Sequence, residues 1–542
     1  MSGGAPARGR RLARAATALG AVTAVAVLLR LPGIASDPLW LDEANTVLIA
    51  ERSFPGIVAA LGVDGNPPLF YFVLHAWMAV FGASEAAARS LPLLFGAAGV
   101  VAAFAAARAL FPGRDRAALA AAALVAIGPL HVYYSQEARM YTLTPLIGVL
   151  ALVALHAALE SGRAREFAAY AALLAAGLYT HNYFLFMAPA GPIAALAAPG
   201  RLGRRRAFAA ASAASLAAAA LYVPWAGVLV RQSASGVSAW IGAFWEATPP
   251  AAALPRSFEV MGVGGAYPSY LIGLGSLGNA VRSPALWLAA RVAGAVLSLL
   301  LVGFGAAAAF RAGGGDRAAF LRLATFALVP LLLPFAASFA IDPIYLVGRY
   351  EMVAFTGFSL LAAAGLDGLG ARSRAAALAA AAAWVGLASL TLGAYYAREA
   401  PSYEKGIAEW IREVAKEGDA FVFPGYTRTV PEYYLRRWNV PGERRSFPGE
   451  VESHLGWFDH AAAVRDAGAT RAEADALASA LAPVVERGGR VFLVGDWSNV
   501  PGSLIVADWL RSALVARLGA PEPIGASPGR RPPFEVFRRR GP

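Results

Sequence analysis

The sequence contains no cysteine among its 542 residues. Disulfide bonds and thiolate metal sites are therefore excluded, and the redox compartment cannot be read from cysteine usage. Charged residues are also scarce: they make up 15% of the chain, whereas a soluble globular protein carries about a quarter. With a mean hydropathy of +0.53, this shortage points to many membrane spans rather than one large water-soluble core.

Positive residues outnumber negative ones, 47 Lys and Arg against 35 Asp and Glu, which gives a formal net charge of +12. In a soluble protein this excess would suggest nucleic acid as a partner. In a membrane protein the placement of positive residues is more informative than their sum. We therefore expect no nucleic-acid partner and expect the chain to contact membrane lipids.

Apolar runs recur through the first three quarters of the chain. About 17 to 25 residues are needed to cross the hydrocarbon of a bilayer, and we predict about 11 transmembrane helices from runs close to this length. The runs lie near Ala15–Ile34, Ala88–Phe111, Ala117–Tyr134, Tyr141–Leu159, Phe167–His181, Tyr183–Ala198, Ala207–Val230, Ala285–Phe310, Leu321–Ile341, Val353–Leu369 and Ala375–Tyr395.

Clustered arginines orient these runs. Clusters precede the first run and follow the second, fourth, sixth, eighth and tenth, so all fall on one side of the membrane. The positive-inside rule makes this the cytoplasmic side. We predict a multi-pass protein of the cytoplasmic (inner) membrane with its N-terminus in the cytoplasm and its C-terminal domain outside. The cluster residues are Arg8, Arg10, Arg11, Arg14, Arg114, Arg116, Arg163, Arg165, Arg201, Arg204, Arg205, Arg206, Arg311, Arg317, Arg372 and Arg374.

Two segments have rival interpretations. A cleaved signal peptide is the alternative for the first run, but its "GIAS" end is a weak cleavage site and the run is long, so we predict a retained span. Asn66–Gly82 is apolar but too short to span after its Pro-Pro pair, and a crossing there would reverse every later arginine cluster. We expect a helix in the outer interface, with Tyr71 and Trp77 at headgroup level. The loop Arg231–Pro284 looks similar.

The composition changes after Pro401. Amphipathic helical segments alternate with short strand-like runs in Tyr403–Phe423 and Ala474–Trp497, and Ser503–Arg539 adds a third such unit. This alternation is typical of a small α/β domain with a largely parallel sheet. No Gly-rich phosphate loop opens a helix, so no nucleotide site is expected. We predict a membrane domain over 1–400 and an extracytoplasmic α/β domain over 401–542.

The stretch "DPLWLDEANT" places two adjacent carboxylates, Asp42 and Glu43, just after the first run on the outer side. Helix capping is one interpretation, because both acids favour a helix N-terminus. Neighbouring residues on a helix project about 100° apart, so the two carboxylates would not share one task. We expect one of them to face a cavity and the other to brace it.

Two more polar clusters fall in outer loops. In "HVYYSQEARMY" a helical continuation would align Tyr133, Glu137 and Tyr141 on one face and turn Arg139 toward a phosphate; the alternative is an interfacial belt of Tyr and Arg. In "DPIYLVGRYE" Arg349 adjoins an apolar helix, where an unpaired guanidinium is costly and tends to mark a site. The alternative there is snorkelling to the headgroups.

Histidines give no metal signal. The six of them show no paired zinc-ligand spacing, and a lone His such as His181 at an outer turn is more often structural than catalytic. We predict no metal site and no cofactor. A divalent ion bound by Asp42 or Glu137 is an open alternative without support in the sequence.

Together these stretches resemble the GT-C superfamily of membrane glycosyltransferases, above all the bacterial relatives of protein O-mannosyltransferases and of the lipid A aminoarabinose transferase. The resemblance covers roughly residues 15–400, and the domain after Pro401 fits the family's extracytoplasmic appendage more loosely. The motifs are specific for the superfamily but do not identify the sugar. They are "PLWLDEANT", "NPPLFYFVLHAWMAVFGASEAAARSLPLLFG", "YYSQEARMYTLTPL", "GLYTHNYF" and "GRYEMVAFTGFSLL".

The resemblance implies a polytopic α-helical protein that takes a sugar from a polyprenyl-phosphate donor on the outer leaflet. Asp42 matches the general base, and Glu43 the positioning acid beside it. The acceptor would be a lipid, a glycan or a protein. The donor-phosphate site implied by the family comprises Glu137, Arg139 and Arg349, to which we add Tyr141 and Tyr350. The candidate substrate-cavity residues are Asn66, His75, His131 and His181. Many relatives have His in place of Asn66, which puts a protonatable or metal-binding role at that position in doubt.

The physical chemistry of sugar transfer agrees with these assignments. Transfer needs a base near the acceptor and a positive group near the departing phosphate, and direct displacement would invert the anomeric carbon. The main alternative is a transporter or flippase of lipid-linked sugars. Such a protein would need polar groups at several depths, whereas this chain concentrates them on one face. A noncatalytic scaffold fits less well, because the acids and arginines are present.

Overall fold

The computed structural model describes residues 4–234, 241, 245, 250–264, 284–341, 343–398, 403–456, 458–495, 501–523 and 534–538. Most of the predicted loop 231–284 and the first residue of "DPIYLVGRYE" lie outside the described residues. The chain forms two compact units, described separately below. Unit 1 comprises Met1–Ser36, Asn66–Ser233 and Ser238–Glu399, and unit 2 comprises Asp37–Gly65, Ala234–Val237 and Ala400–Pro542.

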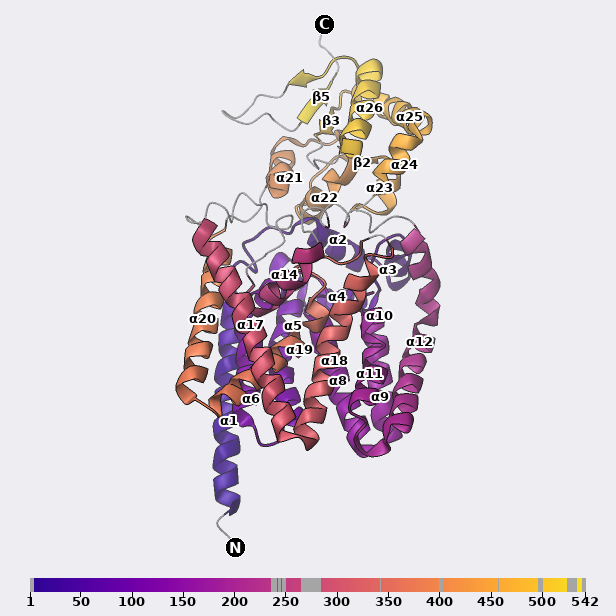
Figure 1. Ribbon diagram of the computed structural model, residues 1–542. Coiled ribbons are helices and arrows are strands. Elements are labelled where there is room, and N and C mark those ends of the chain that lie inside the picture. The colour runs from indigo at the N-terminus through magenta and orange to yellow at the C-terminus, as the bar shows by residue number, and fades with distance from the viewer. Residues whose placement is uncertain are drawn as a thin grey trace. The chain divides into compact units, whose positions relative to one another are not determined.

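Unit 1 is a bundle of α-helices, most of which run alongside one another (Figure 1). The segment predicted as an interfacial helix forms α4. The helices are α1 Gly4–Arg30, α4 Leu69–Phe81, α5 Glu85–Leu110, α6 Asp115–Ile127, α7 Pro129–Ser135, α8 Leu143–Ser161, α9 Ala164–Leu178, α10 Phe184–Met187, α11 Ala190–Ala197, α12 Arg204–Ala234, α14 Pro250–Gly262, α17 Pro284–Ala312, α18 Gly314–Ala337, α19 Met352–Gly370 and α20 Arg374–Tyr396, with the 3-10 turn η1 Gly200–Leu202.

Every predicted apolar run is helical, but the runs differ in length. Among the described residues, eight helices are long and apolar enough to cross a membrane, or nine if the bent pair α6–α7 is one span. The fifth and sixth runs form shorter helices, α9 with 15 residues and the α10–α11 segment Phe184–Ala197. The polytopic helical fold is therefore confirmed, and the full count of about eleven spans stays a prediction.

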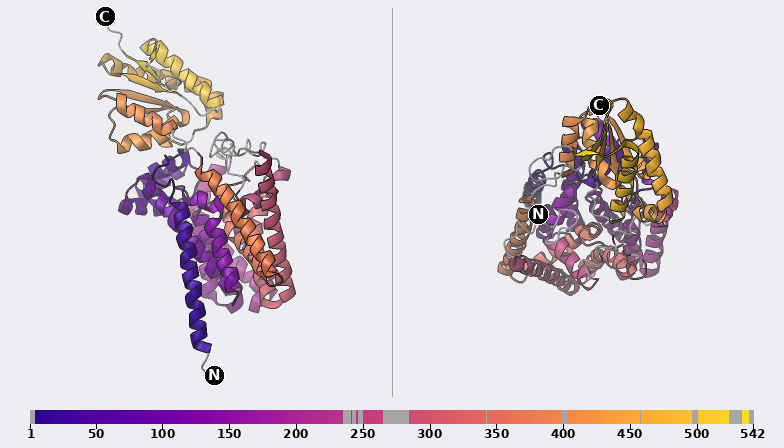
Figure 2. Two further views of the ribbon diagram at one scale, coloured as in Figure 1. Left: turned by 90° about the vertical axis from the view of Figure 1, so that its left-hand side faces the viewer. Right: turned by 90° about the horizontal axis from the view of Figure 1, so that it is seen from above.

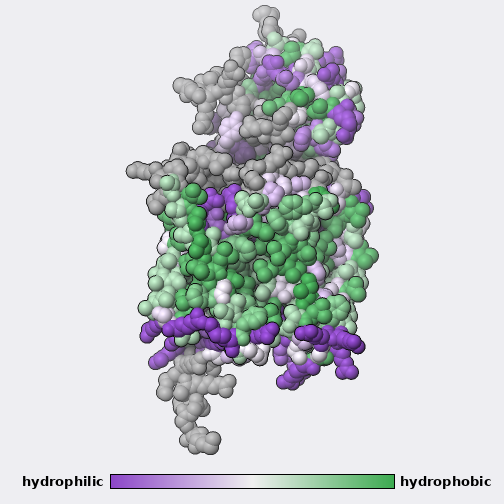
Figure 3. All heavy atoms as spheres, viewed as in Figure 1, coloured by the Kyte–Doolittle hydropathy of each residue, from purple (hydrophilic) through white to green (hydrophobic). Residues whose placement is uncertain are grey.

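The outer surface of the bundle is apolar. Large aliphatic side chains on α12 and α17 point outward, with exposed fractions from 70% at Leu216 to 49% at Leu299. Figure 3 shows a broad hydrophobic band on one face, with hydrophilic residues along its lower edge. Apolar surface on this scale is unfavourable in water and suits contact with lipid.

Ion pairs gather the arginine-rich connections at one end of unit 1. Arg114, between α5 and α6, contacts Asp316 at the start of α18 and lies 3.1 Å from Asp367 near the end of α19. Arg322 on α18 donates to Glu160 near the end of α8 (2.8 Å) and to the carbonyl oxygen after α11 (3.0 Å). The connections that follow the second, fourth, sixth, eighth and tenth runs thus lie together, as the arginine pattern requires. The side of the membrane they face stays a prediction.

A buried arginine holds the break between α6 and α7, which meet at 57°. Pro129 opens α7 and has no N–H to donate to the preceding turn. The Arg30 guanidinium, fully buried at the end of α1, instead donates to the carbonyl oxygens of Val125 (3.2 Å) and Ala126 (2.9 Å) and lies 2.8 Å from Nδ1 of His131. Since unpaired carbonyl groups are costly in an apolar bundle, these bonds make the break tolerable.

Unit 2 contains a five-stranded sheet in the order β2-β1-β3-β5-β4. β1 pairs in parallel with β2 and β3, whereas β5 pairs antiparallel with β3 and β4. The predicted parallel arrangement thus holds for three strands and fails at the β5–β4 edge. The strands are β1 Ala420–Pro424, β2 Glu443–Phe447, β3 Val491–Val494, β4 Glu522–Pro523 and β5 Phe534–Phe537.

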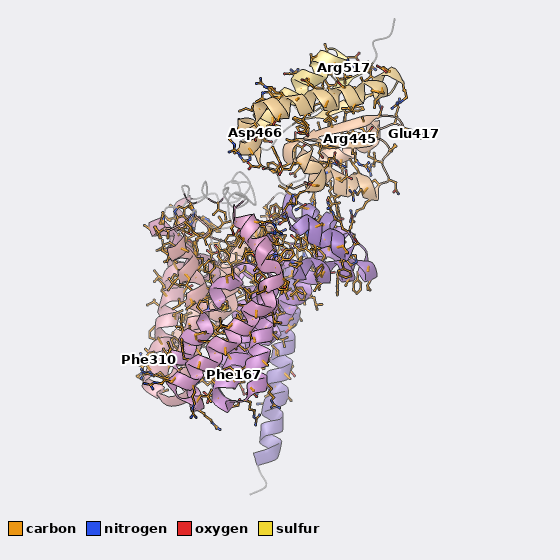
Figure 4. All side chains as sticks on the ribbon, turned by 90° about the vertical axis from the view of Figure 1, so that its right-hand side faces the viewer. Phe167, Phe310, Glu417, Arg445, Asp466 and Arg517 are labelled. Atoms are coloured by element: carbon orange, nitrogen blue, oxygen red, sulfur yellow. The ribbon has the colours of Figure 1, made fainter. Side chains whose placement is uncertain are left out.

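Helices cover both faces of this sheet (Figure 2). Val422 packs with α25 and α26 on one face, while its neighbour Phe421 stacks on Phe492 on the other, with ring centroids 4.7 Å apart. Charged side chains such as Glu417 and Asp466 are exposed (Figure 4), as expected for a domain in water. The helices of unit 2 are α2 Leu41–Ala50, α3 Phe54–Leu61, α21 Tyr403–Val414, η2 Gly425–Arg428, α22 Thr429–Arg437, α23 Glu450–Ser453, α24 His460–Arg465, α25 Ala467–Glu486 and α26 Pro501–Leu518.

The segment that carries α2 and α3 folds with the C-terminal domain inside unit 2. The N–H of Leu39 donates to the hydroxyl of Tyr434 on α22 (3.1 Å). An ion pair of 2.8 Å joins Glu51 to Arg437, also on α22. These contacts link residues almost four hundred positions apart. The predicted domain boundary at residue 400 assigned the two segments to different domains.

Glu432 on α22 is the centre of an ion-pair network. Its carboxylate lies 3.0 Å from Arg428, 2.6 Å from Arg436 and 3.1 Å from Arg444. Burial alone would raise the pKa of this carboxyl, but the three guanidinium groups outweigh burial and lower it below its ordinary value of 4.5.

We predict that Glu432→Gln destabilises the domain by about 3 kcal/mol at neutral pH, because the guanidinium groups lose their common partner. The folded-state pKa is lowered, so this contribution is complete above the ordinary pKa of 4.5 and is lost as the pH falls through the folded value. Melting temperatures of the full-length proteins in detergent should therefore converge in acid. A gap that stays constant with pH would contradict the prediction. Glu443→Gln, which removes an exposed partner of Arg445, should change stability by less than about 1 kcal/mol.

Candidate functional site

Two arginine side chains lie near the ring of Tyr141 in unit 1. The Cζ atom of Arg139 is 5.8 Å from the centre of the Tyr141 ring, and that of Arg349 is 5.5 Å from it. Both arginines are 5% exposed. These two residues, called the arginine pair below, thus place two buried guanidinium groups beside one ring, and Arg139 also donates to the hydroxyl of Tyr71 at 3.3 Å.

The loop that carries Arg139 is not a continuation of α7. The helix ends at Ser135 and turns follow it, so the expected helical alignment through Tyr141 is wrong. The side chain of Gln136 explains the ending, because it donates to the carbonyl oxygens of Arg30 (3.2 Å) and Pro32.

Aromatic rings from three predicted outer loops surround Tyr141. Its ring centroid lies 4.5 Å from that of Tyr134 and 5.9 Å from that of His181. Tyr350 continues the cluster, 5.5 Å from His181 and 4.2 Å from Tyr183. The three loops therefore meet at one place in unit 1, although long stretches of helix separate them in sequence.

A buried carboxylate holds the turn that carries Arg349. Glu351 is fully buried, and its Oε2 accepts from the N–H groups of Gly348 (2.8 Å) and Arg349 (3.1 Å). Its Oε1 accepts from the hydroxyl of Ser257 on α14 at 2.5 Å. Burial raises the pKa of Glu351, while the hydrogen bonds from Ser257 and the backbone act in the opposite direction.

Sequence reasoning missed Glu351 and Ser257 as parts of this site. Glu351 stands in the quoted stretch "GRYE", but an acid just before an apolar helix reads as an ordinary N-terminal charge. Ser257 lies 94 positions away in a segment without a recognisable motif, so no sequence signal could have paired the two.

The remaining candidate cavity residues have other surroundings. His131 is fully buried in α7, where its ring faces Arg30 and stacks on Phe355 with centroids 5.2 Å apart. His75 lies on α4 and Asn66 just before it, both half-buried. Their assignment to a substrate cavity stays a prediction, whereas His181 lies inside the aromatic cluster described above.

Asp42 and Glu43 lie in the first turn of α2, in unit 2. Glu43 is fully buried, and its Oε2 accepts from the backbone N–H of Trp40 at 3.4 Å, which closes the start of the helix. Asp42 is half-buried. The capping contact thus belongs to Glu43, and the two carboxylates have different surroundings, as their offset on a helix predicts.

No group of three or more His, Cys, Asp or Glu side chains within the described parts of the chain could hold a metal ion. The arginine pair and the rings near it are the candidate site in unit 1.

Comparison with known structures identifies the fold of the chain. ArnT from Cupriavidus metallidurans in the apo state matches 95% of this chain and 96% of its own, with a TM-score of 0.56 and 13% identity. The chain has the GT-C fold. ArnT bound to undecaprenyl phosphate gives a TM-score of 0.55 at 14% identity, covering 95% of this chain and 97% of that one.

Two further comparisons bear on this GT-C fold. A family model described as dolichyl-phosphate-mannose-protein mannosyltransferase matches residues 65–227. The Archaeoglobus fulgidus oligosaccharyltransferase complex with zinc and sulfate matches 79% of this chain with a TM-score of 0.51 and 13% identity, and the chain spans 62% of its length. No curated protein sequence matches the chain. The resemblance drawn from the sequence motifs is thus confirmed at the level of the fold.

We predict that the Tyr141 ring is needed to hold the arginine pair. Tyr141→Phe keeps the aromatic face and should match the wild-type protein in a titration with undecaprenyl phosphate, the lipid bound in one ArnT structure. Tyr141→Leu removes the face, and the loss of about 1 kcal/mol for such contacts corresponds to roughly fivefold weaker binding. Equal affinities for the two variants in a calorimetric titration would show that the ring has no such role.

Proposed function

We propose that this protein transfers a sugar from a polyprenyl-phosphate donor to an acceptor hydroxyl at the outer face of the cytoplasmic membrane. The observation that carries the proposal is the buried arginine pair around Tyr141 in a GT-C bundle. Support comes from ArnT, which was solved with undecaprenyl phosphate, and from the family model, whose description names a dolichyl-phosphate sugar. In both the lipid is a polyprenyl chain ending in phosphate.

The arginine pair suits the donor phosphate. Guanidinium groups bind phosphate through charge-assisted hydrogen bonds, often two at a time. When the bond between the sugar and the phosphate breaks, negative charge develops on the leaving phosphate, and positive groups already in place stabilise it without further reorganisation. Glu137, Tyr141 and Tyr350 complete the proposed donor site.

Asp42 is the proposed general base, and Glu43 supports it. The acceptor oxygen forms a bond to the anomeric carbon while the bond from that carbon to the phosphate oxygen breaks. The acceptor proton passes to the Asp42 carboxylate, and polyprenyl phosphate departs, so the anomeric configuration inverts. The contact between Glu43 and the N–H of Trp40 supports this division of roles, because it gives the bracing task to Glu43 and leaves proton transfer to Asp42.

The C-terminal α/β domain, residues 401–542, has no phosphate-binding loop at its helix starts that can be read in the sequence. We assign it to acceptor recognition or to covering the site rather than to bond making. The products that the intact protein makes would identify its acceptor as a lipid, a glycan or a protein.

We predict that Asp42→Asn lowers single-turnover transfer about 100- to 10,000-fold, the usual range for a general base, while donor affinity is preserved. Arg349→Ala should weaken donor binding as well as turnover, because it removes charge from the phosphate site. Asp37→Asn, in the same segment, serves as the matched control and should stay near wild type. Near-normal transfer by folded Asp42→Asn would leave the acid a structural role only. Movement of the donor lipid without any transfer product would favour a flippase.

The predicted topology can be tested with single cysteines, because the natural chain has none. Ser161 ends α8 and is exposed, and it should be labelled only from the cytoplasm. Ser402, which lies outside the described residues, should react with an impermeant maleimide in intact cells or spheroplasts. Equal labelling of both positions by the impermeant reagent would contradict a cytoplasmic N-terminus with an extracytoplasmic C-terminal domain.

A further inference from the structure

We propose that Glu351 is a positioning residue for Arg349: its buried carboxylate holds the turn at residues 347–350 in the shape that keeps the Arg349 guanidinium against Tyr141. The inference rests on the proposed function, since that function assigns Arg349 to the donor phosphate. Glu351 acts through the backbone and makes no contact with substrate in this scheme.

The backbone of the 347–350 turn forms an anion-binding concavity that Glu351 fills. Gly348 has a φ of +86°, a left-handed conformation that a residue with a Cβ adopts only with strain. Consecutive N–H groups in such a turn converge on one point and bind anions. Here the N–H groups of Gly348 and Arg349 both donate to Oε2 of Glu351, at 2.8 and 3.1 Å. The amides are thereby occupied by the protein's own carboxylate, and the Arg349 side chain remains directed at the Tyr141 ring.

The second carboxylate oxygen attaches the turn to α14. Oε1 of Glu351 accepts from Ser257 at 2.5 Å, and the Ser257 hydroxyl also lies 2.7 Å from that of Tyr345. Ser257 is fully buried, so water does not compete for these bonds. One side chain thus links the backbone of Arg349 to a helix that is distant in sequence.

The opposite side of the turn is attached to α7. The Tyr134 hydroxyl donates to the carbonyl oxygen of Gly348 at 2.6 Å, and the Tyr134 ring lies 4.5 Å from that of Tyr141. The loop of Arg349 is therefore tied both to α14 and to the segment that leads to Arg139. The distance between the two members of the arginine pair depends on this turn.

A buried carboxylate costs free energy that an apolar side chain of similar size would not. Its retention at this point is explained by the two amides that need a common acceptor, since a buried N–H without a partner is itself costly. The raised pKa of Glu351 reflects the same burial. The geometry therefore requires a hydrogen-bond acceptor at position 351 and does not require a negative charge.

The test follows from that distinction. Gln at position 351 can direct its carbonyl oxygen at the two amides and its NH₂ at the Ser257 hydroxyl, which can accept. Glu351→Gln should therefore keep undecaprenyl phosphate affinity and donor KM within about threefold of wild type. Glu351→Ala leaves both amides without an acceptor and should weaken affinity about tenfold or more, which is within the worth of one charge-assisted contact.

A double-mutant cycle in the full-length protein separates positioning from general damage. If Glu351 acts through Arg349, Glu351→Ala should cause no further loss of affinity in the Arg349→Ala background. Additive losses would overturn the inference, as would a Glu351→Gln variant as impaired as Glu351→Ala. Glu259→Gln is the matched control, because it alters another buried acid of the same region, paired with Arg291, and should leave affinity unchanged.

Two outcomes keep the test decisive. If Glu351→Ala does not fold, Ser257→Ala takes its place in the cycle. Ser257→Ala should cause a smaller loss of affinity for undecaprenyl phosphate, and this loss should also vanish in the Arg349→Ala background. Persistence of the loss in that background would overturn the inference. If Arg349→Ala itself binds undecaprenyl phosphate as well as wild type, the proposed donor site fails, whereas normal binding by Glu351→Ala beside a weakened Arg349→Ala refutes the positioning role alone.

Discussion

Polar groups inside an apolar bundle must find partners within the protein, and this requirement shapes unit 1. Arg30 meets it for the break between α6 and α7, where it supplies donors to the carbonyl oxygens of Val125 and Ala126. The break ends the long helix early and lets α7 lead into the loop of Arg139. Without the buried guanidinium, the carbonyl groups at the break would lack donors in a region that water does not reach. Arg30 thereby stabilises the backbone that leads to the proposed site.

Two buried acidic residues accept hydrogen bonds from backbone amides, whereas Arg30 donates to backbone carbonyl groups. Glu351 accepts from two consecutive amides in unit 1, and Glu43 accepts from the amide of Trp40 at the start of α2 in unit 2. Both are fully buried, and both adjoin a residue with a proposed chemical role. In each pair one carboxylate fixes the backbone, and the neighbouring side chain, Arg349 or Asp42, is the one with a proposed role toward the substrate. Such support is what keeps a functional group within the small tolerance that catalysis requires.

The sequence was reliable where a signal is periodic or repeated. Apolar runs predicted the helices of unit 1, and the arginine clusters predicted which connections lie together. Prediction from the sequence failed where the local conformation depends on contacts with residues that are distant in the chain. The strand β2 was missed because its sequence, Glu443 to Phe447, is mostly polar, which an edge strand tolerates but a strand pattern does not reveal. The helical continuation through Tyr141 was wrong: α7 ends at Ser135, and the Gln136 side chain that follows donates to the carbonyl oxygens of Arg30 and Pro32, which are about a hundred positions away.

By itself the sequence determined that this is a polytopic helical membrane protein with a C-terminal α/β domain, because hydropathy and charge act along the chain and need no knowledge of contacts. It also indicated which connections between the apolar runs carry unusual polar residues. Only the tertiary structure decided that the arginine pair shares the ring of Tyr141, that Glu351 and Ser257 support the Arg349 turn, and that the helix carrying Asp42 folds with the C-terminal domain. These pairings join residues up to 395 positions apart. Hydrogen bonds and ring contacts at such separations depend on how buried surfaces fit together, which no local pattern records.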